Sequence, residues 1–311
     1  MNTPSNALHE STLPSEGVAP AMMSATRPLY WSVRRELWEN RFVYIAPFSI
    51  AAVFLFGFVI SMVHLPAKMH RLAGLDAAQM RDAIVAPYDF AAGLMMLTSI
   101  LVSVFYCVDA LYGERRDRSI LFWKSMPVSD LTTVLAKASI PLLLVPLLTF
   151  AITVAMQVIM ALVSSAALLG SGMGVAELWT QLALPRMWVS LLYHFLTAHA
   201  LWPMPIYCWL LLVSAWARRA VFLWAVLPLI AIAGLEGILF RSSYFAMLIG
   251  GRLIGSAARS GYSPPGTFPT HPLAHMTPER FLGSVGLWFG LAVSAAFLAA
   301  AVRLRRSQGP I

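Results

Sequence analysis

The run Ile45-Ala-Pro-Phe-Ser-Ile-Ala-Ala-Val-Phe-Leu-Phe-Gly-Phe-Val-Ile-Ser-Met-Val63 contains no charged residue. A helix needs about 20 predominantly apolar residues to cross a hydrocarbon core roughly 30 Å thick, and this run has that length. The whole chain is similar: of its 311 residues, 59% are hydrophobic and 12% charged, with a mean hydropathy of +0.72. One water-soluble core cannot hide so much apolar surface. The sequence therefore predicts an all-α polytopic membrane protein, because lipid offers no partner to the edges of an open sheet.

Charged residues and Pro/Gly clusters divide the chain into six such apolar runs. The fourth run is interrupted by Pro203 and Pro205, each of which removes a backbone donor. The segment Tyr244–Ile254 is too short to cross a bilayer, so we expect it either to re-enter the outer leaflet or to lie on its surface. The predicted spans are about 45–63, 87–112, 138–163, 188–217, 221–240 and 281–302.

Basic residues predict the orientation of these spans. The formal charge of +8 comes from short clusters beside apolar runs, which is typical of topology signals and not of a nucleic-acid-binding face. With six spans the clusters share one side, so we expect both termini in the cytoplasm and the spans in the inner (plasma) membrane. Residues 1–27 are predicted to be a disordered cytoplasmic tail before a membrane domain of residues 28–311. The clusters are Arg34, Arg35 and Arg41; Arg115, Arg116, Arg118, Lys124 and Lys137; Arg218 and Arg219; and Arg303, Arg305 and Arg306.

The stretch before the first span reads as an amphipathic interfacial helix. Aromatic residues alternate with charged ones at helical spacing, and Trp31 and Trp38 are expected to anchor it at headgroup depth. Arg34 and Arg35 favour the anionic inner leaflet. The alternative is a plain juxtamembrane anchor with no role beyond topology.

The connection between the second and third spans, Gly113–Lys137, is far longer than a helical hairpin needs. Its charged start is followed by a short apolar helix predicted over Ser119–Ser125, a break at Pro127 and an N-cap at Ser129 or Asp130. Such an element can offer an apolar face to a cytoplasmic partner. The residues expected on that face are Ile120, Phe122 and Trp123.

This connection also carries a resemblance. The pattern Gly-Glu-Arg-Arg…Ser-Ile-Leu-Phe-Trp-Lys-Ser-Met-Pro-Val-Ser…Lys resembles the intracellular loop of ABC-2 type transporter permeases, and Trp31–Arg41 resembles their connecting helix. Six spans, cytoplasmic termini and a re-entrant stretch before the last span extend the resemblance over nearly the whole chain. In that family the loop is a coupling helix that docks in a groove of a separate ATPase subunit. The coupling residues implied here are Glu114, Arg115, Arg118, Ile120, Phe122, Trp123 and Pro127.

The resemblance implies the permease subunit of an ATP-driven exporter, paired with itself or with a similar permease, above two ATPase chains that bind ATP and Mg. The chain has no Gly-x-x-x-x-Gly-Lys-[Ser/Thr] loop, so it is not expected to bind or hydrolyse ATP itself. No catalytic, cofactor or metal site is predicted. His194 and His199 point about 140° apart on an ideal helix, which does not suit one shared metal.

Ionisable residues inside spans are costly in lipid unless they face protein or water. Asp109 and Glu236 therefore either line a substrate path or serve helix packing, and the Pro203–Pro205 break is either a hinge or a static kink. Two other functions stay open. One is an ATP-independent secondary transporter or channel that uses these acids, and the other is a non-transporting scaffold that recruits a cytoplasmic protein through residues 115–137.

Overall fold

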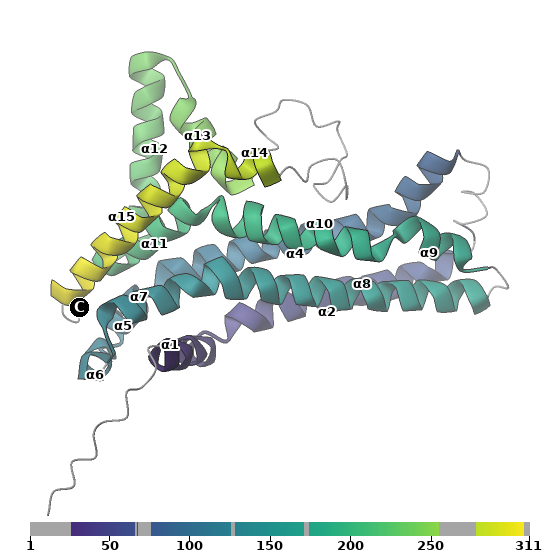
Figure 1. Ribbon diagram of the computed structural model, residues 1–311, viewed down its shortest axis with the longest axis horizontal. Helices are drawn as coiled ribbons and strands as arrows, with labels where there is room; N and C mark the ends of the chain where they lie inside the picture. Colours follow the sequence, from purple (N-terminus) through teal and green to yellow (C-terminus); the bar gives the residue numbers. More distant parts are fainter. Residues whose placement is uncertain are drawn as a thin grey trace, which may run out of the picture.

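The computed structural model describes residues 26–65, 67, 76–125, 128–170, 174–254 and 278–307. Within these ranges every regular element is a helix, as predicted (Figure 1). In chain order the elements are α1 (Thr26–Glu39), α2 (Phe42–Ser61), η1 (Met62–His64), α4 (Ala77–Asp109), α5 (Tyr112–Arg116), α6 (Ile120–Ser125), α7 (Asp130–Ser139), η2 (Ile140–Leu144), α8 (Val145–Gly170), α9 (Ala176–Leu182), α10 (Leu184–Leu196), η3 (Thr197–Leu201), α11 (Met204–Trp216), α12 (Val221–Phe240), α13 (Tyr244–Ile254), α14 (Pro278–Leu282) and α15 (Val285–Ser307).

Helices α2, α4, α8 and α10 form a bundle and run side by side along the long axis of the molecule (Figure 1). Its core is apolar, with Met95, Met156 and Phe195 fully buried. Several polar side chains are also buried there. Among them, Gln157 donates to the Tyr88 carbonyl at 3.2 Å and accepts from the Trp188 indole at 3.0 Å. Because both ends of the Gln157 amide are satisfied, this residue joins α4, α8 and α10 without leaving a buried polar atom unpaired.

Among the described residues, five helical stretches are long and apolar enough to cross a membrane, and a sixth counts if a bent pair is one span. The bent pair is Leu178–Leu201 with Met204–Trp216, which turns by 43° at the predicted Pro203 and Pro205 break. The prediction of a multi-span helical membrane protein is therefore confirmed at this level. The five stretches are Phe42–His64, Ala78–Arg116, Asp130–Gly170, Val221–Phe240 and Val285–Ser307.

Two helices begin earlier than predicted. Helix α4 starts at Ala77 and not near Pro87, because the Asp76 carboxylate caps it by accepting from the Ala78 amide at 2.9 Å. Pro87 lies inside this helix. The third span was predicted from about Ala138, but the helical stretch that contains it starts at Asp130. Its N-cap is Ser129, one of the two candidates predicted, and the Ser129 hydroxyl accepts from the Thr132 amide. The two predicted span boundaries followed the apolar runs, while the helices start at their caps.

Two side chains satisfy carbonyls at the proline break. Pro203 has no N–H for the His199 carbonyl, and the Tyr207 hydroxyl donates to that oxygen at 3.2 Å. The Arg252 guanidinium of α13 donates to the Trp202 carbonyl at 3.0 Å and lies 4.3 Å from the centre of the Trp202 ring. The Trp202 indole donates a hydrogen bond to the Gly251 carbonyl at 2.7 Å. Helix α13 is therefore held against the proline break by hydrogen bonds in both directions.

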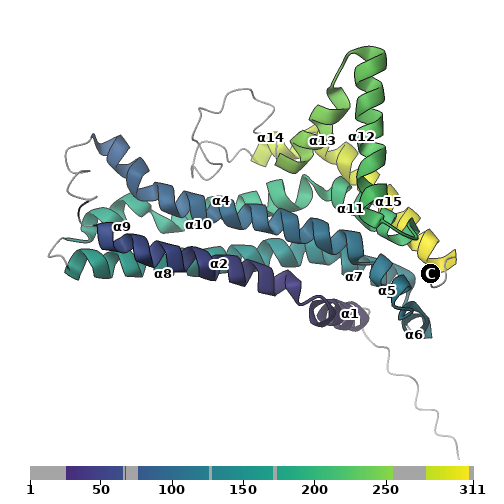
Figure 2. The ribbon, with the colours of Figure 1, turned by 180° about the vertical axis from the view of Figure 1, so that it is seen from behind.

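Helix α12 stands off the bundle and runs across the direction of α2 and α8 (Figures 1 and 2). Only its base is packed, where Val221 and Ala225 are buried. Ala220 before it and Arg241 after it both have left-handed backbone, which allows the sharp turns at its two ends. Its length and apolar composition suit a span, so most of its surface is available to lipid or to another chain.

One end of the molecule gathers α1, α5, α6, α7 and the C-terminal end of α15 (Figure 2). We call it the charged end, because the basic clusters around Arg35, Arg115, Lys137 and Arg305 lie there. The opposite end, where α4 begins and α9 lies, is called the far end. The disordered tail was predicted over residues 1–27. Residues 1–25 lie outside the described residues, while Thr26 and Arg27 belong to α1 and not to a tail.

Candidate functional site: a buried ionic cluster under an exposed helix

Six charged side chains from α1, α5, α7 and α15 meet at the charged end. Three are carboxylates and three are cations, so the group is balanced. Several of them are almost completely buried, which is rare for charged residues unless they are paired. We call the group the ionic cluster, and its members are Arg35, Glu36, Glu114, Asp130, Lys137 and Arg305.

Glu36 is the most deeply buried carboxylate of the cluster, at 1% exposure. The Lys137 ammonium lies 2.8 Å from one of its oxygens and 3.0 Å from the other. Arg35 donates to it at 2.7 Å, and the Tyr106 hydroxyl of α4 donates at 2.9 Å. Helix α1 is thus held against α4 and α7 by charge-assisted hydrogen bonds, which are roughly twice as strong as neutral ones.

Glu114 of α5 links the remaining elements. One of its oxygens lies 3.1 Å from the Lys137 ammonium and 3.2 Å from Arg35, and its other oxygen accepts from Arg305. Arg305 also donates to Asp130 at 3.0 Å. A single carboxylate therefore contacts cations from α1, α7 and α15, which are far apart in the sequence.

The electrostatics of the cluster explain why it forms as a group. Burial lowers the pKa of Arg35, but the carboxylates of Glu36 and Glu114 outweigh that effect and raise its pKa above the ordinary value. An isolated buried charge costs several kcal/mol in desolvation, and the cost is offset only when every charge has partners of good geometry. We therefore expect the cluster to form as a unit or not at all.

Arg115, beside Glu114 on α5, has a different role. Its guanidinium donates to the carbonyls of Ala215 and Ala217, the latter at 3.2 Å, where α11 ends. The Ser214 hydroxyl accepts from the amides of Leu111 and Tyr112, at 2.8 and 2.9 Å. The break between α4 and α5 is therefore fixed to the end of α11 by four hydrogen bonds, and α5 cannot move independently of α11.

Helix α6 confirms the short helix predicted in the loop, and it projects from the charged end (Figure 2). One expectation for it was wrong: Ile120 is 2% exposed and packs within the chain, so it is not on the presented face. Leu121 and Phe122, each 59% exposed, form that face. Arg118, just before the helix, adopts left-handed backbone at φ 58°. The Trp123 side chain and Pro127 lie outside what the structure describes.

Helix α1 is amphipathic as predicted, but its arginines divide between two faces. Trp31 and Trp38 are exposed, and the Arg34 guanidinium lies over both rings, at 5.3 and 5.0 Å from their centres. Arg35 does not join this outer face as expected, because it belongs to the ionic cluster. The outer face retains the aromatic and cationic composition of an interfacial helix.

The intramembrane acids of the sequence analysis make local contacts. Asp109 lies 3.7 Å from Arg116, with both side chains about half exposed, and a Cβ on Gly113 would come within 3.2 Å of it. Glu236 accepts from the Ser242 hydroxyl and from the amides of Tyr244 and Phe245, so it caps the start of α13. Both carboxylates therefore have partners close in the sequence, and the ionic cluster does not include either of them.

Sequence reasoning used Arg305 only to orient the spans, used Lys137 for orientation and as the last residue of the loop pattern, and gave Glu36 no role. A signal for the cluster was present: Glu36 and Glu114 are acidic residues within basic stretches at the same side of the membrane. Such residues have cations available to them and little reason to face anionic lipid. What the sequence did not show is which of the many cations each would contact.

Among the described residues, no group of three or more His, Cys, Asp or Glu side chains could hold a metal ion. His194 contacts the Ser190 carbonyl of its own helix at 2.7 Å. Cys107 and Cys208 are buried free thiols. No known protein family, curated protein or solved structure matches this chain. Fold and site together define a multi-helix protein whose long apolar helices suit a membrane, with a neutral ionic cluster at one end.

Proposed function

We propose that this chain is the permease subunit of an ATP-driven ABC transporter, an exporter that couples to a separate ATP-binding subunit through α5 and α6. The charged end faces the cytoplasm in this proposal, and two permease chains, alike or similar, enclose the path in the plasma membrane. The observation that carries it is the pairing of an exposed apolar helix, α6, with the fixed helix α5 immediately before it.

The contacts of α5 suit the transfer of motion. A partner that binds Leu121 and Phe122 pushes on α5 through a turn of only three residues, Asp117 to Ser119. Arg115 is hydrogen-bonded to the end of α11, so a displacement of α5 also moves α11. Glu114 contacts cations of α1, α7 and α15, so the same displacement moves those helices as well. Packed helices with discrete contacts shift as rigid bodies, so a docked ATPase would move several membrane helices at once.

The test is co-purification from the native membrane, with identification of partners and an ATPase assay on the eluate. Phe122→Ala should weaken retention of the ATPase by about tenfold or more, because buried aromatic anchors dominate such contacts. Phe240→Ala is the matched control, since Phe240 is also exposed but is the last residue of α12, at the opposite end of that helix from its packed base. Equal retention by the two variants would remove α6 from the interface.

The two alternatives predict other results. A secondary transporter or channel would purify without an ATPase, and an ion gradient would drive the transport of its substrate. A scaffold would retain a cytoplasmic protein through α6 without any hydrolysis of ATP. Absence of an ATPase partner from the wild-type eluate would exclude the proposed coupling.

A further inference from the structure

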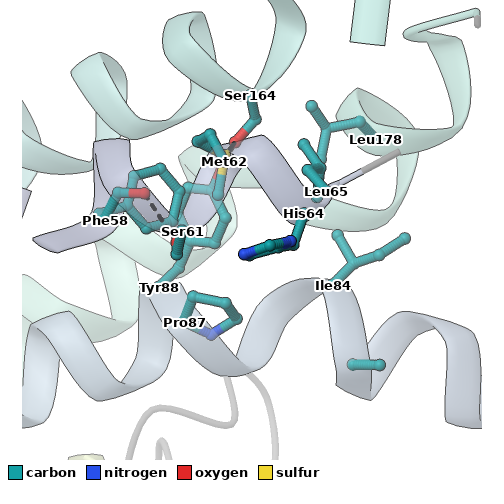
Figure 3. A pocket seen from close by; sticks show the side chains of 11 residues that line it. Phe58, Ser61, Met62, His64, Leu65, Ile84, Pro87, Tyr88, Ser164 and Leu178 are labelled. Carbon is teal, nitrogen blue, oxygen red and sulfur yellow. Dashed lines mark hydrogen bonds between the residues drawn. The ribbon is translucent and has the colours of Figure 1, made fainter. Parts of the chain in front are cut away.

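The far end of the bundle contains a cavity between α2, η1, α4, α8 and α9, at the opposite end from the ionic cluster (Figures 1 and 3). Its volume is about 190 Å³, and most of its wall is apolar. It continues into an open groove of about 440 Å³ between α2 and α4, with which it shares Phe58, Ser61 and Pro87. Cavity and groove fall together within the range of about 300–1,000 Å³ that is usual for small-molecule sites.

The groove opens on the surface that α2 and α4 turn outward. Val53 and Phe90 line it and are exposed, and an added Cβ on Gly57 would meet no atom within 4 Å. Both helices have the length and composition of membrane spans, so the medium that reaches the groove is the hydrocarbon of the bilayer. An apolar groove open to hydrocarbon admits an acyl chain without any desolvation of polar groups.

Polar groups collect at the inner and outer limits of the cavity. The Tyr88 hydroxyl lies 3.4 Å from the Ser164 hydroxyl, deep between α4 and α8. Figure 3 shows the His64 imidazole between Tyr88 and Ile84, entering from η1 where α2 has ended. Arg81 is exposed and lies three residues before Ile84. This spacing places it on the same face of α4, about one turn closer to the start of the helix at Ala77. The His64 imidazole and the cation of Arg81 thus lie toward the end of the cavity that is away from the groove.

We infer that this cavity and groove bind one anionic membrane phospholipid, with an acyl chain in the groove and the phosphate beside His64 and Arg81. The apolar wall selects the chain, and the basic residues select the charge of the headgroup. This inference depends on membrane embedding and not on the proposed coupling to an ATPase, so either can fail alone.

The experiment uses the full chain in nanodiscs of phosphatidylcholine that contain a trace of phosphatidylglycerol with a photoreactive acyl tail. After illumination, labelled peptides are identified by mass spectrometry. Labelling is expected to concentrate on the segments around Phe58 and Tyr88, above the level of the exposed apolar helix α12. Labelling spread evenly over all lipid-facing helices would overturn the inference, because it would describe ordinary contact with bulk lipid.

Gly57→Phe supplies the blocking variant, since the new ring enters open groove space. It should lower labelling at the cavity by about tenfold, which corresponds to about 1.4 kcal/mol of binding free energy. Gly234→Phe is the matched control: Gly234 lies within α12, its added Cβ also meets no atom within 4 Å, and labelling at the cavity should not change. Equal labelling in the two variants would exclude the groove as the site.

His64→Gln combined with Arg81→Gln tests the headgroup. Labelling by phosphatidylglycerol should fall to the level obtained with a phosphatidylcholine probe carrying the same tail. A wild-type protein that takes up the two probes equally would overturn the anionic selectivity. Elution of each variant as the same species on size-exclusion chromatography shows that any loss of labelling is not a loss of fold.

Discussion

The two ends of the helical bundle bury different kinds of side chain. At the charged end the buried groups are ions, and each carboxylate there contacts a cation within 3.2 Å. At the far end the buried side chains around the cavity include Tyr88, Ile84 and Leu178, and the polar contacts join neutral groups, such as the Tyr88 and Ser164 hydroxyls at 3.4 Å. The difference teaches that one protein can combine an end whose contacts require fixed geometry with an end whose contacts do not. Ion pairs tolerate little displacement, while an apolar cavity can accept a ligand.

The largest effect should come from breaking the ionic cluster. Glu36→Gln leaves the Lys137 ammonium without its closest partner and should lower the free energy of unfolding in detergent by about 3–5 kcal/mol. Adding Lys137→Met to this variant should restore much of the loss, because the uncompensated charge is gone.

Glu39→Gln is the control for that measurement. Glu39 lies 3.6 Å from Arg35 at the exposed rim, and such pairs contribute about 0–1 kcal/mol. If Glu36→Gln and Glu39→Gln destabilise the protein equally, the distinction between the two ends is wrong. If the double variant is no more stable than Glu36→Gln alone, then the loss does not come from the excess positive charge that Lys137 leaves in the cluster.

An intermediate effect is expected at the junction of α5 and α11. Arg115→Met removes the donors to two carbonyls and should cost about 2 kcal/mol, in the range for hydrogen bonds of charged groups. Arg116→Met, at the next position, removes exposed pairs with Asp109 and Asp117 and the contact with the Tyr112 ring, and should cost at most about 1 kcal/mol. Thermal unfolding of the two variants in one detergent provides the comparison, and a reversed order would mean that α5 is not anchored on α11.

The smallest difference in free energy of unfolding is expected between substitutions of two tyrosines at opposite ends. Tyr106→Phe removes a 2.9 Å bond to the Glu36 carboxylate and should cost about 1.5 kcal/mol or more. Tyr88→Phe removes only the 3.4 Å contact with the Ser164 hydroxyl and should cost about 0.5 kcal/mol. Both rings are almost fully buried, so packing changes are matched. Equal costs in chemical denaturation would show that the electrostatic contrast between the ends is not a contrast in stability.

Several features of the fold follow from local sequence. Runs of about 20 apolar residues, the helix predicted over Ser119–Ser125 and the Pro203–Pro205 break all appear in the structure within a few residues. These features depend on hydropathy and on the missing proline N–H, which act within one or two turns. The start of α4 was misplaced because a single capping side chain, Asp76, extends the helix beyond its apolar run, while the start of α7 agrees with the N-cap predicted at Ser129 or Asp130.

The candidate site was predicted only in part. The loop itself, with Glu114 and Arg115, was recognised from its pattern, but the burial of Ile120 and the inward direction of Arg35 were not. A cation in the sequence has several acids within reach, and its choice depends on which helices pack together. Glu36 and Arg305 are 269 positions apart, and no local rule joins them.

By itself, the sequence determined that this chain is helical and apolar enough for a membrane, where its short helices and its proline break fall, and which side collects the basic residues. The tertiary structure alone decided that six of the charges at that side meet as a neutral cluster, that Arg115 holds the end of α11, and that α2 and α4 leave a cavity at the far end. The physical reason is range. Hydropathy and capping act along one helix, while ion pairing and cavities depend on the packing of helices distant in the chain.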